Sequence, residues 1–443
     1  MSARPTSGSG SGRTRRDLAL PGDAVRPTPA TLDRRTLLRG LAGAGVLGAG
    51  GGLLSACSRL FDDELPDADA TAGSGPQTDG SDTDPGDDRL RVGYLPITDA
   101  TPLLAAHGLG LYEEQGLDVE RPTLLRSWAQ VAEAFQARQV DLVHLLMPMA
   151  VQLRYASDFP LKIVAWNHTG GSALTVANDV DDVAELAGTT VAVPFWHSIH
   201  NVALQLLLEE AGLTPLVGSG DEASAADGTV QLVVMAPPDM PPALAQGSIS
   251  GYIVADPFNA VAELEGIGKV LRFTGDVWLD HACCVSVMHA DTLDERPEFS
   301  QRTLDALVGA QDAVLDDPAA TATLLSEAGE GYLPQPEPAI ARALGHYDLD
   351  EYGDTGAVRN AGWDTDRIGF QPFPFPSYTE ELVRRMQATE VDGDRRFLDD
   401  LDPTTIHADL IDDRYVREAI DHVGGPEVFG LPADLTRSET LDV

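Results

Sequence analysis

The sequence predicts an α/β protein whose strands form parallel sheets with helices on both faces, followed by a mainly helical section. Between residues 90 and 254, short apolar stretches typical of strands alternate with amphipathic segments of helical spacing. From about residue 300 onward, helical patterns dominate. The chain has 443 residues, of which 43% are hydrophobic, and this is enough for one or two such domains.

The elements of the α/β part follow from apolar periodicity and from turn residues between the segments. The expected strands are residues 91–95, 117–120, 141–145, 162–166, 174–177, 190–193, 230–235 and 251–254. The expected helices between them are residues 102–114, 129–138, 201–211 and 243–246. Open α/β sheets bind ligands beyond the C-terminal ends of their strands. We therefore expect ligand contacts from the loops at residues 96–102, 147–150, 194–201 and 255–259.

The helical section has five segments with apolar residues at helical spacing. They are residues 301–315, 318–327, 338–344, 377–388 and 413–422. No internal repeat accompanies them, so a repeat architecture is not expected.

The N-terminal region carries an export signal in its residue pattern. Arg34 and Arg35 precede a weakly apolar stretch at residues 40–56, an arrangement typical of the twin-arginine export route. The stretch is too short and too rich in glycine for a spanning helix. The small-residue step into Cys57 resembles a bacterial lipobox, in which the cysteine is acylated. We expect an exported protein, lipid-anchored to the outer face of the cytoplasmic membrane; the alternative is an ordinary membrane anchor or a disordered tail.

The net charge is positive up to residue 56 and strongly negative after it, and this limits the binding partners that we expect. Residues 1–56 hold eight arginines and three aspartates, a net charge of +5, so the remainder of the −40 chain carries −45. We interpret residues 1–56 as a disordered extension and signal, and residues 57–88 as an acidic tether kept extended by like charges. A strongly acidic surface repels phosphate, so nucleic acid is not an expected partner.

Two adjacent cysteines follow Cys57 in the sequence, and no other cysteine is present. Cys283 and Cys284 are neighbours, and neighbouring cysteines seldom bridge each other, so no disulfide framework is expected. With Asp280 and His281 they offer ligand types that suit zinc or copper. Four ligands within five residues rarely converge, however. We expect these residues to pack or to line a cleft, with no metal and no other cofactor.

Short motifs from residue 90 onward occur in a recognisable order. They include RVGYLPITD at 91–99, EQGLDV at 114–119, SW at 127–128, MPM at 147–149, HN at 200–201, PPDM at 237–240, DPFNA at 256–260 and GDVW at 275–278. This order resembles the solute-binding proteins of ABC importers, in the branch that binds nitrate or bicarbonate. The wider group also takes sulfonates and thiamine precursors. The resemblance extends to about residue 420.

The resemblance implies a two-lobed periplasmic-binding-protein clamshell of type II, with a helical C-terminal section. Residues 89–177 would begin the first lobe, 178–282 would form the second, and 283–425 would complete the first and add the C-terminal helices. Residues 426–443 would be a tail. The implied partners are a small solute in the cleft and an ABC permease in the membrane, and receptors of this group are usually monomers.

Two cleft residues follow from matches to the nitrate and bicarbonate branch. Trp128 matches a tryptophan that lines the cleft, and its alternative role is a core tryptophan. His200, with Asn201, opens a helix and matches a histidine that contacts the bound anion. Free N–H groups at a helix start favour an anion there. The alternative is a helix capped by Ser198 with a surface histidine.

Further expected contacts come from loops at strand ends. Gly171 falls where relatives place a polar side chain, so Ser172 is expected to supply the hydroxyl and Gly171 only its backbone. Thr98 and Asp99 either face the cleft or cap the next helix. Asp256 either contacts the ligand, caps a helix or belongs to a hinge.

Cys284 departs from the pattern of the resemblance. It occupies the place of a charged residue that helps to set nitrate or bicarbonate choice, and a thiol supplies no such charge. The substrate assignment therefore does not follow from the resemblance, and a sulfonate or a thiamine-precursor-like heterocycle is the alternative.

A transport receptor is the expected function, with no catalytic residues. A cysteine-dependent enzyme on the same fold is the competing hypothesis, with Cys284 paired to His200 or His281 as nucleophile and base. A ligand sensor coupled to a membrane partner fits the same sequence features.

Overall fold

Two mixed β-sheets carry the fold, and the chain crosses between them twice. The computed structural model describes residues 87–443 except 219–222, 225, 348, 361–362 and 364–365. These described residues belong to one compact unit. The export signal at Arg34 and Arg35, the lipidation site Cys57 and nearly all of the expected tether therefore lie outside the described residues.

The first sheet has five strands in the order β4-β2-β5-β14-β6. Their bounds are β2 (Val92–Tyr94), β4 (Thr123–Leu124), β5 (Leu142–Leu146), β6 (Leu161–Trp166) and β14 (Cys284–His289). β2 is parallel to β4 and β5, whereas β14 is antiparallel to both β5 and β6.

The second sheet has six strands in the order β10-β11-β9-β12-β8-β13. Their bounds are β8 (Ser172–Val176), β9 (Thr190–Val193), β10 (Thr214–Leu216), β11 (Thr229–Val234), β12 (Gly251–Ala255) and β13 (Lys269–Phe273). β8 is antiparallel to β12 and β13, and the other neighbours are parallel. The predicted α/β class is confirmed, but the expectation of purely parallel sheets is wrong. Apolar periodicity finds a strand without giving its direction, and β8 and β14 each enter a sheet directly after a crossing.

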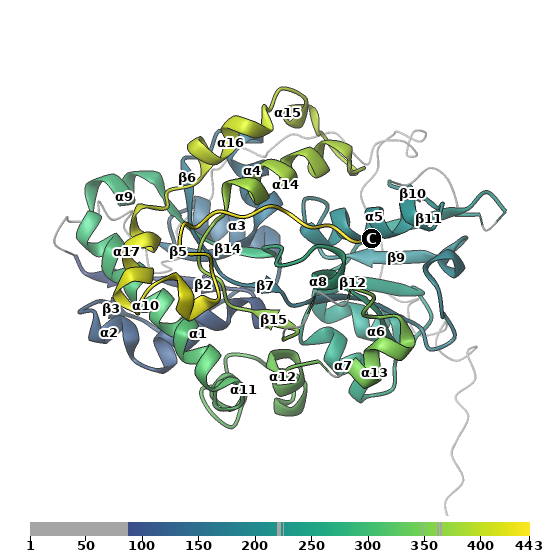
Figure 1. The fold of residues 1–443 in the computed structure, drawn as a ribbon, viewed down its shortest axis with the longest axis horizontal. Coiled ribbons are helices and arrows are strands. Elements are labelled where there is room, and N and C mark those ends of the chain that lie inside the picture. The colour runs from purple at the N-terminus through teal and green to yellow at the C-terminus, as the bar shows by residue number, and fades with distance from the viewer. Residues whose placement is uncertain (1–86, 219–222, 225, 348, 361–362, 364–365) are drawn as a thin grey trace, which may run out of the picture. The chain divides into compact units, whose positions relative to one another are not determined.

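The two crossing segments run side by side. Residues 167–171 lead from β6 to β8, and residues 274–283 lead from β13 back to β14. Thr169 forms an antiparallel bridge with Ala282, and the Gly170 N–H donates to the His281 carbonyl at 3.0 Å. β7 (Thr169–Gly170) also pairs with β15 (Ile368–Gly369), which lies between the two sheets in Figure 1.

Helices surround both sheets. They are α1 (Thr101–Gly108), α2 (Leu111–Glu114), α3 (Trp128–Gln136), α4 (Met147–Ala156), α5 (Ile199–Glu210), α6 (Met240–Ala245), α7 (Phe258–Leu264), α8 (Thr274–Val277), α9 (Ala290–Glu295), α10 (Pro297–Asp316), α11 (Pro318–Leu325), α12 (Glu337–Leu344), α13 (Leu349–Thr355), α14 (Pro376–Ala388), α15 (Arg396–Asp399), α16 (Pro403–Leu410) and α17 (Arg414–His422). Short 3-10 turns are η1 (Thr98–Ala100), η2 (Val183–Leu186), η3 (Pro237–Asp239) and η4 (Pro426–Phe429), and β1 (Arg89–Leu90) pairs with β3 (Asp118–Val119). No helix of this described part is long and apolar enough to cross a membrane.

Two helix predictions need correction. The single helix expected over 102–114 is divided into α1 and α2, because Gly110 adopts a positive φ of 77° that a continuing helix cannot accommodate. The loop expected at residues 147–150 is the first turn of α4, with Pro148 tolerated near the helix start.

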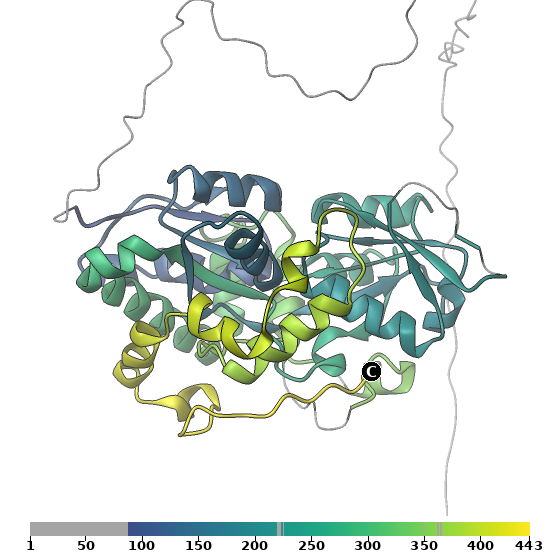
Figure 2. The same ribbon diagram turned by 90° about the horizontal axis from the view of Figure 1, so that it is seen from above.

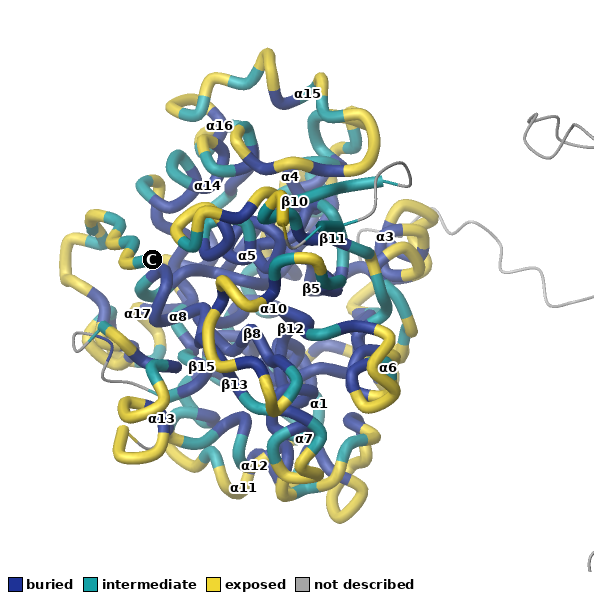
Figure 3. Tube along the Cα trace, turned by 90° about the vertical axis from the view of Figure 1, so that its right-hand side faces the viewer, coloured by how far each residue is buried: buried dark blue, intermediate teal, exposed yellow. Residues whose placement is uncertain are grey.

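Two large apolar clusters make up most of the interior. The larger covers the five-stranded sheet and extends onto one face of the six-stranded sheet, whose other face belongs to the second cluster. Figure 3 shows β5, β8 and β12 in the buried interior. The C-terminal segment runs along the molecule toward the six-stranded sheet (Figure 2), where Leu441 bridges Trp278 and the Asp442 N–H donates to Val277.

A buried ion pair ties β15 to the end of β12. Arg367 is 2% exposed, and its guanidinium lies 3.2 Å from the Asp256 carboxylate and 2.9 Å from that of Glu263. Burial opposes the charge of Asp256 and raises the pKa of its carboxyl, while Arg367 counteracts this shift. Removing the guanidinium would leave the buried Asp256 carboxylate without its cation, whereas Glu263 would keep its ion pair with Arg342 at 3.0 Å.

We expect Arg367→Met to lower the free energy of unfolding by about 3–5 kcal/mol, because a buried pair that loses one partner leaves an uncompensated charge. Urea unfolding followed by tryptophan fluorescence measures this change. Arg359→Met is the matched control, since Arg359 and Glu210 form an exposed pair at 3.8 Å whose loss costs no more than about 1 kcal/mol. Equal effects of the two substitutions would contradict the prediction.

A second stability prediction concerns His289, at the end of β14. Its ring stacks on Phe135 with the centroids 4.1 Å apart, and burial lowers its pKa to about 4. Because the pKa in the unfolded chain is higher, unfolded molecules bind the extra proton between pH 6.5 and 4. Stability contributed by the neutral ring is therefore present above pH 6.5 and lost as pH falls toward 4.

We expect His289→Phe to keep the stacking and to remove about 1–3 kcal/mol of the stability loss between pH 7 and 4.5. Urea unfolding at the two pH values, compared with the unsubstituted protein, measures the difference. An unchanged pH dependence would show that the folded protein already accommodates the charged ring.

Candidate functional site

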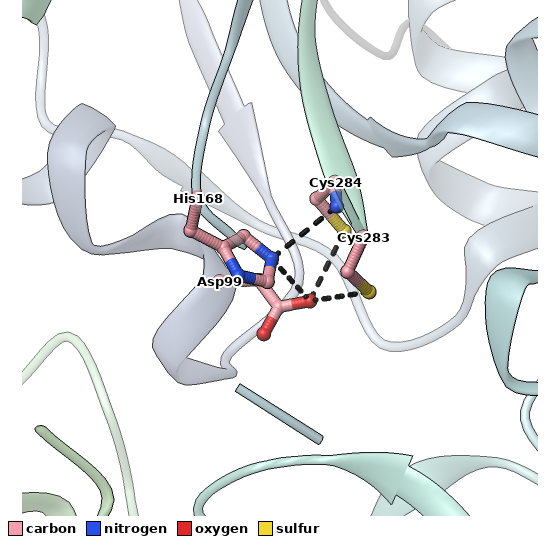
Figure 4. Close-up of side chains that lie close together, drawn as sticks. All are labelled: Asp99, His168, Cys283 and Cys284. Atoms are coloured by element: carbon pink, nitrogen blue, oxygen red, sulfur yellow. Dashed lines mark hydrogen bonds and ion pairs between the residues drawn. The ribbon is translucent and has the colours of Figure 1, made fainter. Parts of the chain in front are cut away.

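Four buried side chains converge where the crossing segments leave the five-stranded sheet. Asp99 lies in η1 after β2, His168 follows β6, and Cys283 and Cys284 lead into β14. Their carboxylate, imidazole and sulfur atoms lie within 4.8 Å of one another, and all four residues are fully buried. Figure 4 shows the three other side chains grouped around the carboxylate of Asp99. We refer to these four residues as the Asp99 cluster.

One carboxylate oxygen holds the Asp99 cluster together. The Asp99 Oδ2 atom lies 3.0 Å from His168 Nε2, 3.3 Å from Cys283 Sγ and 3.1 Å from Cys284 Sγ. The Cys284 N–H also points at His168 Nε2, at 3.2 Å. Three groups therefore share one oxygen, while the other carboxylate oxygen has no partner among the described residues.

Two side chains from the six-stranded sheet meet the Asp99 cluster. Ser172 is the first residue of β8, and His200 lies in the first turn of α5. The Ser172 hydroxyl lies 2.9 Å from His200 Nε2, and Cys283 Sγ lies 3.8 Å from the same nitrogen. The site thus combines groups from both sheets.

The start of α5 explains the orientation of His200. Ser198 is the N-cap, and its hydroxyl oxygen accepts from the Asn201 N–H at 3.1 Å. His200 is only 1% exposed, so the cap and a buried histidine coexist, and the alternative of a surface histidine is wrong. Asn201 turns away from the Asp99 cluster and donates to the carbonyls of Trp196 and Glu390.

His281 lies beside the same residues. Its Nε2 atom is 2.9 Å from the Thr274 hydroxyl, which itself donates to the Ser172 carbonyl at 3.0 Å. Because that hydroxyl proton is already used, His281 Nε2 carries the proton and its Nδ1 is a bare acceptor. Burial lowers the pKa of His281 to about 4, so the ring is neutral.

Trp128 and His144 extend the site along the five-stranded sheet. Their ring centroids lie 5.4 Å apart. His144 Nε2 accepts from the Leu95 N–H at 2.9 Å, so its proton is on Nδ1. Burial lowers the pKa of His144 to about 3, with a further effect from His168. Neither the His144 Nδ1 proton nor the Trp128 indole N–H has a partner in the described part of the chain.

Several buried polar atoms around the Asp99 cluster have no hydrogen-bond partner among the described residues. This is unusual, because buried polar groups are nearly always hydrogen-bonded. The unpartnered atoms around the site are Asp99 Oδ1, Trp128 Nε1 and the Nδ1 atoms of His144, His168, His200 and His281. The set contains both donors and acceptors, so it suits a polar ligand better than an apolar one.

The charges of the Asp99 cluster are coupled. Burial raises the pKa of Asp99 to about 6, although His168 opposes this shift. Burial also opposes a charge on His168, but the Asp99 carboxylate outweighs it and raises the pKa of His168 to about 10. Burial resists ionisation of both thiols, yet hydrogen bonds and nearby histidines lower the pKa of Cys283, while that of Cys284 rises beside Asp99. Cys283 is therefore the thiol that ionises first.

The remaining predicted residues have other contacts. The backbone N–H and the hydroxyl of Thr98 donate to the Asp256 carbonyl, at 3.0 and 2.8 Å. Asp256 accepts from the Ala260 N–H at 3.1 Å and pairs with Arg367. The structure thus gives Asp256 the helix-capping role that was one of its predicted alternatives.

Gly171 has a positive φ of 75°, and a Cβ there would lie 2.9 Å from Ile368. Only glycine fits this close approach without strain.

The structure brings Asp99, Ser172, His200 and Cys284 close together and places Trp128 beside His144. His144 and His168 are residues that the sequence analysis missed. It considered Cys283 and His281 as metal ligands in a local group, and His281 also as a base for Cys284, but neither as a solute contact. His168 follows the strand predicted at 162–166, so the preference of ligand residues for strand ends could have found it. His144 lies inside a predicted strand, where nothing in the pattern marks it.

Comparison with known proteins places the chain in a family. Residues 83–327 match the model of the NMT1-like family. The nitrate/nitrite binding protein NrtA of Nostoc is 23% identical over 244 residues, which cover 50% of this chain and 53% of that protein. The chain thus spans about half the length of this curated relative.

Solved structures show the same fold. The periplasmic nitrate-binding protein NrtA from Synechocystis matches with a TM-score of 0.66 and 20% identity, covering 80% of this chain and 94% of that one. The periplasmic aliphatic sulphonate binding protein SsuA from Escherichia coli matches with a TM-score of 0.50 and 18% identity, covering 68% and 91%. The chain therefore belongs to the NMT1-like family and has the type II periplasmic-binding-protein fold.

Proposed function

We propose that this protein is the solute-binding component of an ABC importer and binds a small polar solute beside the Asp99 cluster. The export signal at Arg34 and Arg35 and lipidation at Cys57 belong to the same proposal. They would hold the protein at the outer face of the cytoplasmic membrane, where it delivers the solute to a permease. The relatives that bind nitrate or sulphonates support a receptor role rather than a catalytic one.

One observation carries the proposal: buried hydrogen-bond donors on the five-stranded sheet, near the Asp99 cluster, lie without partners among the described residues. The Trp128 indole N–H and the His144 Nδ1 proton have no acceptor among the residues that the structure describes. Leaving such donors unpaired costs about 1–3 kcal/mol each, so a solute with acceptor atoms gains affinity by pairing them. Ser172 and His200 supply polar groups from the opposite sheet.

The charged groups of the Asp99 cluster limit the class of solute that can bind beside it. Within the described residues, no arginine or lysine pairs or hydrogen-bonds with Asp99, Cys283 or Cys284. The imidazole of His168 neutralises the Asp99 carboxylate and leaves no excess positive charge for a small anion. We therefore favour a zwitterionic sulfonate or a heterocycle as the solute, rather than nitrate or bicarbonate.

Isothermal titration with nitrate, nitrite, bicarbonate, taurine, alkanesulfonates and an aminopyrimidine tests the solute class. We expect saturable binding at one equivalent for a sulfonate or the pyrimidine and none for nitrate or bicarbonate. Tight nitrate binding would show that another group supplies the charge that Cys284 lacks.

Substitution of the indole tests the position of the site. We expect Trp128→Phe to weaken binding of the identified solute about 3–10-fold, the effect of losing one neutral hydrogen bond. Titration calorimetry measures the change. Trp166→Phe is the matched control, because Trp166 Nε1 is also buried without a partner but its ring packs against Phe375 and Tyr378. Equal weakening by both substitutions would contradict the proposed position.

A cysteine-dependent enzyme is the second candidate, favoured by the position of Cys283 rather than Cys284. Both sulfurs approach Asp99 Oδ2, but Cys283 Sγ also lies 3.8 Å from His200 Nε2. Incubating the protein with the bound solute and analysing the mixture by mass spectrometry separates the two functions. A receptor returns the solute unchanged, and conversion that is lost in Cys283→Ser would identify an enzyme.

A further inference from the structure

The Asp99 cluster has the composition of a metal site. It contains two thiols, one imidazole and one carboxylate, drawn from three separate stretches of the chain. Such a mixture of sulfur, nitrogen and oxygen suits zinc and related transition ions, whereas calcium and magnesium prefer oxygen ligands alone. This set differs from the local group of Asp280, His281, Cys283 and Cys284, which lacks the convergence that a metal needs.

The spacing of the ligand atoms fits one ion. Zinc bonds of about 2.0–2.3 Å in a tetrahedron place neighbouring ligand atoms about 3.3–3.8 Å apart. The distances from Asp99 Oδ2 to its three neighbours are 3.0, 3.3 and 3.1 Å, and all four ligand atoms lie within 4.8 Å. Shifts of less than about 1 Å would therefore place the four atoms around an ion at zinc bond lengths.

The two sulfur atoms converge although the residues are adjacent. In a regular strand, successive side chains point to opposite faces. Cys283 precedes β14 and Cys284 is its first residue, so the pleat is not yet established at this point. Both sulfurs consequently face the same carboxylate oxygen (Figure 4).

Hydrogen bonding within the cluster is incomplete, and this is an observation independent of the spacing. Asp99 Oδ1 is buried without a partner among the described residues, as is His168 Nδ1. His168 Nε2 faces both the Cys284 N–H and the Asp99 carboxylate, and one atom cannot accept from the first while donating to the second. When it accepts the amide proton, it has no proton for Asp99, and two electron-rich atoms then lie 3.0 Å apart, an arrangement that a cation stabilises.

We propose that Asp99, His168, Cys283 and Cys284 bind one divalent transition-metal ion of the zinc type. The ion takes one bond from each residue, and His168 is neutral in this state. The Cys283 and Cys284 thiols each release one proton as the two metal–sulfur bonds form, His168 releases the Nε2 proton that pairs it with Asp99, and no electron is transferred. Two thiolates and one carboxylate then surround the dication, so the occupied site carries one net negative charge.

Titration of the purified full chain with Zn²⁺, after removal of metal by a chelator, tests the proposal. With a chromophoric competitor we expect one equivalent to bind, a rise in melting temperature and affinity that weakens at lower pH as the thiols regain protons. Co²⁺ should give the strong visible absorption of a tetrahedral thiolate site.

Substitutions then identify the ligands. Cys283→Ser, Cys284→Ser and Asp99→Asn should each weaken Zn²⁺ binding by at least about 10–100-fold, the range already seen for outer-shell partners. Cys57→Ser and His289→Phe are the matched controls, because they remove the remaining cysteine and a buried histidine away from the cluster, and they should bind as the unsubstituted protein does. Circular dichroism of each variant without metal confirms folding.

Two results would overturn the proposal. One is the absence of a tight equivalent in a folded, reduced protein, which would identify the cluster as a hydrogen-bonded part of the solute site. The other is binding that survives in both Cys283→Ser and Cys284→Ser. Because the titration contains no solute, its failure leaves the proposed transport function untouched, and failure of solute binding leaves the metal site untouched.

Discussion

The pairing of the two crossing segments is the constraint on which the rest of the structure depends. The bridge between Thr169 and Ala282 and the Gly170–His281 hydrogen bond fix these segments against each other. His168 lies on one segment and Cys283 at the end of the other, so their approach follows from this pairing. Backbone hydrogen bonds therefore bring together side chains that are more than one hundred residues apart in sequence.

Further hydrogen bonds and one ion pair lie beside the paired segments and connect residues near the two sheets. The Gly171 N–H donates to the Arg367 carbonyl at 2.7 Å, and the Thr98 hydroxyl donates to the Asp256 carbonyl at 2.8 Å. Arg367 in turn neutralises the Asp256 carboxylate. These residues place Ser172 and His200 beside Cys283, although none of them belongs to the Asp99 cluster.

The proposed solute site and the proposed metal site have the same physical basis. Both contain buried polar groups that outnumber their hydrogen-bond partners among the described residues. Burying a carboxylate is costly unless it is paired and hydrogen-bonded. Asp99 has three neighbours at one oxygen, whereas its other oxygen has no hydrogen-bond partner in the described part of the chain. Trp128 and His144 likewise bury donors for which the residues that the structure describes supply no acceptor. An ion and a solute would complete different parts of the same incomplete network.

Local sequence signals, which are apolar periodicity and strand ends, predicted the α/β class and the approximate positions of most elements. Of the residues in the candidate site, Asp99, Ser172 and Cys284 lie at strand ends, whereas Trp128 and His200 lie in the first turns of helices. Tertiary structure alone decided the antiparallel entry of β8 and β14, the capping role of Asp256 and the part played by His144, His168 and Cys283. Strand direction and side-chain convergence depend on the two crossings, which join distant segments through hydrogen bonds that leave no periodic trace in the chain.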